Sequence, residues 1–143
     1  MLANGYAADT ISGKVVIVED DDLMQKLMID IFMDLGADCT AFVTADDALI
    51  HLMRAQSPCA LLVTDFTLSG QLDGRELAVM VHERWSDMPV ILTTGYGHEV
   101  GRNLPDGIVL LFKPWSVEAL VQTATQMINP NAESGQSAPD LAA

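Results

Sequence analysis

Residues 60–65, Ala-Leu-Leu-Val-Thr-Asp, constrain the fold more than any other stretch of the chain. Ala60 to Thr64 form a run that is apolar on both sides of a β-strand, which is typical of a central strand in a parallel sheet. The run ends abruptly in Asp65, and the residues after it have the composition of a loop. Open α/β sheets place their functional groups at the carboxyl ends of their strands. Asp65 is therefore a candidate functional residue, and the alternative is a carboxylate that caps a loop or helix.

Strand-like and helical patterns alternate along the rest of the chain. Strands are predicted at residues 14–18, 39–43, 60–65, 88–94 and 107–112. Helices are predicted from the spacing of apolar residues at 22–35, 45–56, 75–85 and 117–128. The glycine-rich residues 96–105 allow at most a short helix. This alternation predicts an α/β fold, a doubly wound parallel sheet with right-handed crossovers and helices on both faces.

Length and charge limit the classes of function. The 143 residues suffice for one folded domain, expected at residues 13–129 between a flexible arm (1–12) and a disordered tail (130–143). Asp and Glu outnumber Lys and Arg by 20 to 7, and the formal charge of −13 disfavours nucleic acid and anionic membranes. No apolar run approaches the roughly 20 residues of a spanning helix, and the first residues lack a signal-peptide pattern, so a cytoplasmic location is expected.

Polar groups stand at the ends of four predicted strands. The first strand ends in Glu19-Asp20, the third in Asp65, the fourth in Thr94 and the fifth in Lys113. These ends meet at one edge of a doubly wound sheet. Taken singly, the acidic residues could serve the dipole of the next helix, Thr94 could be an ordinary strand-end residue, and Lys113 could be a solvated side chain.

The combination of these groups favours phosphoryl transfer. Carboxylates so close together raise one another's pKa unless a cation lies among them, and a site with oxygen ligands alone suits Mg²⁺. A divalent ion beside a hydroxyl and an ammonium group neutralises phosphoryl oxygens. The nucleophile is then a carboxylate, and the product is an aspartyl phosphate.

Five short motifs, in order and at strand ends, carry a resemblance to a known family. The chain resembles the receiver domain of two-component response regulators, of the single-domain or hybrid-histidine-kinase type. The resemblance extends over about residues 14–128 and rests on Val15 to Asp21, Leu62 to Asp65, Leu72-Asp73-Gly74, Leu92 to Gly95 and Phe112 to Trp115. It implies a flavodoxin-like (βα)5 sandwich whose five-stranded parallel sheet has the order 2-1-3-4-5.

The resemblance also implies roles for the metal ligands and the acceptor. Asp65 is the phosphoacceptor, and it takes the phosphoryl group from a phosphohistidine of a histidine kinase or histidine phosphotransfer protein. Mg²⁺ is bound by Glu19, Asp20, Asp65 and the backbone carbonyl of Thr67.

Two further roles follow from the motifs at the fourth and fifth strands. The Thr94 hydroxyl hydrogen-bonds the phosphoryl group and Lys113 pairs with it, while the Lys113-Pro114 peptide is expected to be cis. The output is expected to pass through contacts with an unknown downstream protein target. Apart from its own phosphorylation and slow autodephosphorylation, the chain is not expected to be an enzyme.

The chain departs from the family pattern at two places. Leu110 stands where an aromatic switch residue is common in the family. The usual coupling of that residue to Thr94 and the usual dimer are therefore not expected. We expect a monomer or a weak dimer. The loop after Asp65 has Ser69 where Pro is common and one extra residue before Asp73.

Two other functions compete with a phosphoacceptor. A phosphohydrolase of the haloacid-dehalogenase type also uses an Asp nucleophile, but it has an acid Asp two residues later, where this chain has Thr67. A receiver that signals by binding alone is the second alternative, and the complete set of site residues argues against it.

The first helix offers a candidate docking face for the phosphoryl donor. Ile29 and Met33, beside Gln25, lie off the predicted buried stripe, and we hypothesise that they contact a helical partner. That stripe comprises Met24, Leu27, Met28, Ile31 and Leu35.

Overall fold

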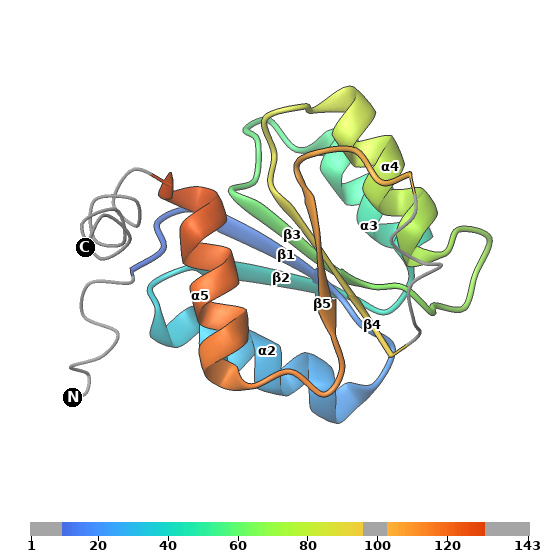
Figure 1. The fold of residues 1–143 in the computed structure, drawn as a ribbon. Coiled ribbons are helices and arrows are strands. Elements are labelled where there is room, and N and C mark those ends of the chain that lie inside the picture. The colour runs from blue at the N-terminus through green and yellow to red at the C-terminus, as the bar shows by residue number, and fades with distance from the viewer. Residues whose placement is uncertain (1–9, 96–102, 131–143) are drawn as a thin grey trace.

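Five parallel strands form one sheet in the order β2-β1-β3-β4-β5, which confirms the predicted fold class (Figure 1). The computed structural model describes residues 10–95 and 103–130. The strands are β1 (Lys14–Val18), β2 (Asp38–Phe42), β3 (Leu61–Asp65), β4 (Val90–Thr94) and β5 (Ile108–Phe112). Residues 1–9 of the expected arm, 96–102 of the expected short helix and 131–143 of the expected tail lie outside the described residues.

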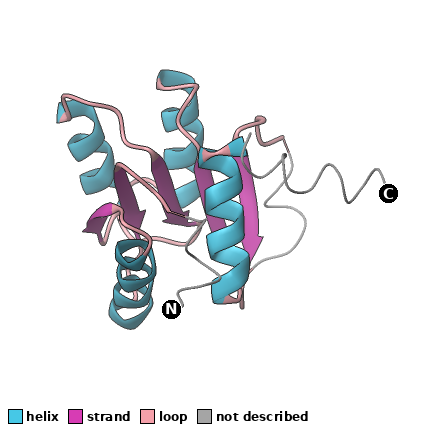
Figure 2. Ribbon diagram, turned by 90° about the vertical axis from the view of Figure 1, so that its left-hand side faces the viewer, coloured by secondary structure: helices cyan, strands magenta, loops and turns pink. Residues whose placement is uncertain are grey.

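Helices cover both faces of the sheet in pairs. They are α2 (Asp22–Asp34), α3 (Ala45–Arg54), α4 (Gly74–Arg84) and α5 (Val117–Ile128). Helices α2 and α5 lie on one face, and α3 and α4 lie on the other (Figures 1 and 2). Within the described ranges, no helix has both the length and the apolar character needed to cross a bilayer.

The sheet separates two hydrophobic clusters because strand side chains alternate between its faces. In β1, Val16 and Val18 pack with α3 and α4, whereas Val15 and Ile17 pack with α2 and α5. Every residue of β3 and β4 is buried. The apolar run that ends at Asp65 is therefore a central strand, as predicted, and its end is held rigidly by neighbours on both sides.

Helix α2 is rotated relative to the prediction. Its buried residues are Met28, Ile31 and Phe32, followed by Leu35. Leu27 is 43% exposed, so its assignment to the buried stripe is wrong. Ile29 is half-buried and packs against the cluster beneath α2 and α5, whereas Met33 is 59% exposed, and the docking face around them stays a prediction. The stripe centres on Phe32, the largest side chain that α2 can bury against the sheet.

Candidate functional site

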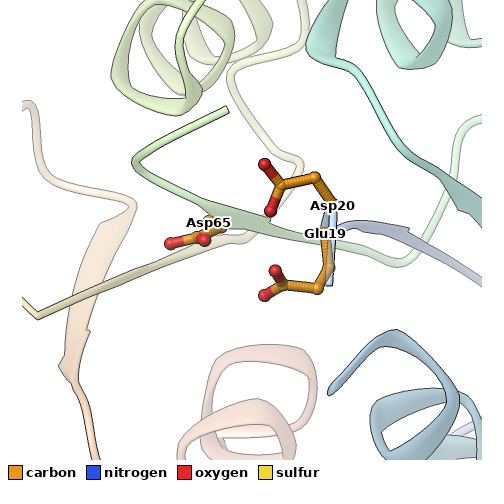
Figure 3. Close-up of side chains that lie close together, drawn as sticks. All are labelled: Glu19, Asp20 and Asp65. Atoms are coloured by element: carbon orange, nitrogen blue, oxygen red, sulfur yellow. The ribbon is translucent and has the colours of Figure 1, made fainter. Parts of the chain in front are cut away.

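The carboxylates of Glu19, Asp20 and Asp65 lie together at the carboxyl edge of the sheet (Figure 3). Val18 pairs with Thr64, so the residues that follow these two on the parallel strands β1 and β3 lie side by side. One oxygen from each of the three carboxylates lies within 4.8 Å of the others. The register of two central strands thus gathers acidic groups that are far apart in the sequence.

Helix capping does not account for these carboxylates. Asp21 caps α2, since its Oδ1 accepts a hydrogen bond from the Leu23 amide at 3.1 Å. Asp73 caps α4 in a reciprocal capping box with Glu76. Asp21 and Asp73 therefore supply the N-caps of these two helices, and neither the cluster carboxylates that follow β1 nor Asp65 is needed for that purpose.

Glu19 is buried with its charge only partly compensated. It is 2% exposed, its Oε2 accepts a hydrogen bond from the Asp21 amide at 3.1 Å, and its Oε1 has no hydrogen-bond partner among the described residues. Burial raises the pKa of Glu19 to about 7; the Asp21 amide and Lys113 offset part of this effect, and Asp65 and Asp20 add to it. A buried carboxylate of this kind calls for a cation.

Lys113 supplies one positive charge at this edge. It follows β5, and its Nζ lies 3.1 Å from Asp65 Oδ2 and 3.9 Å from Glu19 Oε1. When all three carboxylates are ionised, the one ammonium group leaves an excess of two negative charges, which matches a divalent cation. The Glu19 oxygen that lacks a hydrogen-bond partner among the described residues, and the all-oxygen set of the cluster, fit Mg²⁺.

Thr94 ends β4, the strand that pairs with β3, and Thr67 follows Asp65 by two residues along the chain. Thr94 is the buried last residue of β4, one step beyond the Asp65–Thr93 pair, and its carbonyl accepts a hydrogen bond from the Lys113 amide at 2.8 Å. Thr67 is exposed in the loop after Asp65. The Lys113-Pro114 peptide is cis.

Gly74 is a site residue whose role the sequence analysis did not identify. A Cβ at this position would collide with the backbone carbonyl oxygen of Asp65. The Gly74 amide also donates to the Phe66 carbonyl at 2.9 Å. The first turn of α4 therefore packs directly on the backbone of the candidate acceptor. The signal in the sequence was a glycine immediately after the helix-capping Asp73.

A doubly wound sheet with an acidic cluster and a lysine at its carboxyl edge defines a signalling domain of the receiver class. The family model described as response regulator receiver domain matches residues 15–125, well over half of the chain. The chain therefore belongs to the response regulator receiver domain family of two-component systems.

Individual relatives agree with this assignment. The response regulator protein FleR of Pseudomonas aeruginosa is 31% identical over 86 residues, which are 60% of this chain and 18% of FleR. The chain thus spans less than a fifth of the length of that relative.

Solved structures show the same fold. A response regulator receiver protein from Sinorhizobium medicae has a TM-score of 0.75 at 21% identity, over 82% of this chain and 95% of its own. A CheY-like receiver domain protein from Methanospirillum hungatei also has a TM-score of 0.75 at 21% identity, over 87% of this chain and 99% of its own.

Proposed function

We propose that this chain is a Mg²⁺-dependent phosphoacceptor in which Asp65 receives a phosphoryl group from a histidine kinase or histidine phosphotransfer protein. The observation that carries the proposal is the convergence of Glu19, Asp20 and Asp65 within 4.8 Å, with Lys113 Nζ 3.1 Å from Asp65. Membership of the receiver family supports a histidine kinase as the type of partner.

Each side chain has a defined task in the transfer. A carboxylate oxygen of Asp65 attacks the phosphorus of the phosphohistidine, the phosphorus–nitrogen bond breaks, and the imidazole of the donor leaves with the bonding electron pair. Lys113 pairs with the negative phosphoryl oxygens, and the Thr94 hydroxyl donates a hydrogen bond to one of them. Glu19, Asp20, Asp65 and the Thr67 carbonyl would hold Mg²⁺, which would supply positive charge to the phosphoryl oxygens.

Phosphorylation by a small donor tests this proposal. With acetyl phosphate and Mg²⁺, intact-mass measurement is expected to show one added phosphoryl group, and EDTA is expected to prevent it. Asp65→Asn is expected to abolish the addition, whereas Asp87→Asn, a change at an exposed residue between α4 and β4, leaves it intact. Equal labelling of the Asp65→Asn protein, or no labelling of the unaltered protein with Mg²⁺, would contradict the proposal.

Fast turnover of phosphate esters is not expected. No carboxylic acid stands at position 67, where a phosphohydrolase of the competing type needs one to protonate the leaving group. Release of phosphate from small phosphomonoesters is therefore expected to be negligible. The protein acts as a phosphorylated switch that catalyses its own phosphorylation and slow hydrolysis.

An exposed apolar surface next to Lys113 suits a helical donor. Leu23 is 81% exposed. The residue after it, Met24, lines a cavity of about 400 Å³ together with Leu27, Lys113, Pro114 and Trp115. We propose this surface as the docking face in preference to the one around Ile29, because Lys113 of the candidate site lines it. Large exposed apolar groups beside a reactive centre are typical of a protein contact.

Two variants of α2 separate the new docking face from the predicted one. Leu27→Lys is expected to slow transfer from the cognate donor while leaving labelling by acetyl phosphate unchanged. Met33→Lys changes a residue of the same helix that is also exposed, and is expected to leave both reactions unchanged. If Met33→Lys alone slows transfer from the donor, the originally predicted face is the correct one.

The remaining features support a cytoplasmic protein that signals through protein contacts. Cys39 and Cys59 are both free thiols, as is usual in a reducing compartment. The formal charge of −13 suits a downstream protein target with a basic face and opposes binding to nucleic acid. We expect a monomer or a weak dimer.

A further inference from the structure

The loop that follows Asp65 is closed at its base. The Phe66 amide donates to the Thr93 carbonyl at 2.8 Å, and the Gly74 amide donates to the Phe66 carbonyl at 2.9 Å. The loop between these points carries Thr67, whose carbonyl belongs to the proposed metal site. These bonds hold both ends of the loop but do not by themselves fix its tip.

Asp46, in the first turn of α3, holds the tip. Its Oδ1 accepts hydrogen bonds from two successive amides, those of Gln71 at 3.1 Å and Leu72 at 3.2 Å. Gly70 has φ +109°, and a Cβ there would lie 2.8 Å from the same oxygen. The loop backbone thus lies directly against the carboxylate, through bonds that its negative charge strengthens.

The Asp46 carboxylate is not needed to cap its own helix. Thr44 is the N-cap of α3, and its hydroxyl accepts a hydrogen bond from the Asp47 amide at 3.2 Å. The negative charge of Asp46 is also compatible with the positive end of the helix dipole. An acidic side chain in a favourable position is therefore directed at a loop 25 residues further along the chain.

We propose that Asp46 is a positioning residue for the phosphoacceptor site. By fixing residues 70–72, it orders the loop that presents the Thr67 carbonyl and so increases the affinity of the site for Mg²⁺. The loop needs such a tether because it contains Gly70 and no stiffening proline between Phe66 and Gly74. The inference rests on the proposed function, since it concerns the same metal site.

Four proteins test this role: the unaltered chain, Asp46→Ala, Asp46→Asn and Asp47→Ala. Asp46→Asn keeps an oxygen acceptor but removes the charge, and Asp47→Ala removes an exposed charge from the same helix turn. Mg²⁺ dissociation constants are measured by titration. Hydrogen exchange at the Gln71 and Leu72 amides is measured separately in metal-free protein.

Asp46→Ala is expected to raise the dissociation constant for Mg²⁺ about tenfold and to accelerate exchange at both amides by at least about tenfold, because two hydrogen bonds are lost. Asp46→Asn is expected to change both measurements less than Asp46→Ala does, because it keeps the oxygen acceptor but loses the charge that strengthens the bonds. Asp47→Ala is expected to stay close to the unaltered protein. This pattern excludes a simple effect of negative charge on a nearby cation.

The possible failures are distinguishable. If the unaltered chain binds no Mg²⁺, the proposed function is wrong. If it binds Mg²⁺ and Asp46→Ala binds equally well, the positioning role is wrong, even if exchange becomes faster throughout α3. If Asp46→Asn or Asp47→Ala weakens binding as much as Asp46→Ala does, charge and not the tether is responsible, and the inference is again overturned.

Discussion

Glu19 should make the metal-free domain lose stability as the pH rises. Burial raises the pKa of Glu19 from an ordinary 4.5 to about 7. Between these values the folded domain binds more protons than the unfolded chain, so the contribution of Glu19 to stability is present below pH 4.5 and is lost as the pH rises through about 7. Each unit of pKa corresponds to about 1.4 kcal/mol, and the full effect is therefore at most about 3.5 kcal/mol.

The assay is urea unfolding of the unaltered protein and of Glu19→Gln, at several pH values and with EDTA present. The useful quantity is the difference between the two proteins, because contributions common to both then cancel. The unaltered protein is expected to lose up to about 3.5 kcal/mol relative to Glu19→Gln on going from acid to neutral and mildly alkaline pH. Glu83→Gln, at an exposed position of α4, serves as the control and should not change the pH dependence.

Mg²⁺ should reverse the loss. An ion that binds only the folded domain adds about 2.7 kcal/mol at a free concentration of about 100 times its dissociation constant. The gain should be largest above pH 7, where Glu19 is ionised, and should be much smaller in Glu19→Gln. Parallel stability curves for the unaltered protein and Glu19→Gln without metal would refute the argument that Glu19 is buried with uncompensated charge.

Two further predictions concern packing around the site and the thiols. Gly74→Ala should lower the free energy of unfolding by about 2 kcal/mol or more, because the added Cβ meets the Asp65 carbonyl oxygen, which cannot rotate away. Gly95→Ala is the control in the same urea assay, since no atom lies within 4 Å of a Cβ at that position. Burial raises the pKa of Cys59 to about 11, so its thiol should resist a disulfide reagent near pH 8 until the domain unfolds. The measurement uses Cys39→Ser protein, in which Cys59 is the remaining thiol. Rapid labelling of folded Cys39→Ser would contradict this expectation.

The sheet could be predicted from the sequence because its central strands are apolar on both faces. A chain in which such strands alternate with helices can adopt few folds other than a parallel sheet, and right-handed crossovers restrict the topology further. The gathering of Glu19, Asp20 and Asp65 follows from the same restriction, since parallel neighbours end at one edge. The part of the site that depends on the register of strands was therefore accessible without a structure.

The rotation of α2 could not be predicted, because apolar residues surround much of this helix. Leu27 and Phe32 belong to different stripes with equally good helical spacing, and only packing against the sheet selects between them. The same limit applies to Met53 in α3 and Val117 in α5, which are apolar residues of their helices and yet are 54% and 39% exposed. Intrinsic pattern does not determine which stripe meets the sheet when several are available.

Contacts between distant loops were also out of reach. The sequence identified Asp46 only as part of a helix start, and nothing local indicates that its oxygen accepts bonds from Gln71 and Leu72. Gly74 likewise acquires its meaning from the Asp65 backbone behind it. Such residues become visible only when the chain is folded, although they determine the geometry of groups that the motifs reveal.

The acidic run after β1 shows how neighbouring carboxylates come to have different tasks. Asp21 adopts the extended backbone of a helix N-cap and is occupied by the Leu23 amide. Asp20 is exposed, and Glu19 is buried with one oxygen that has no hydrogen-bond partner among the described residues. A domain that needed these residues only to begin α2 could bury an uncharged side chain in place of Glu19 at lower cost. The unfavourable burial of Glu19, beside Asp65 and within reach of Lys113, is therefore the strongest physical argument that a cation completes this site.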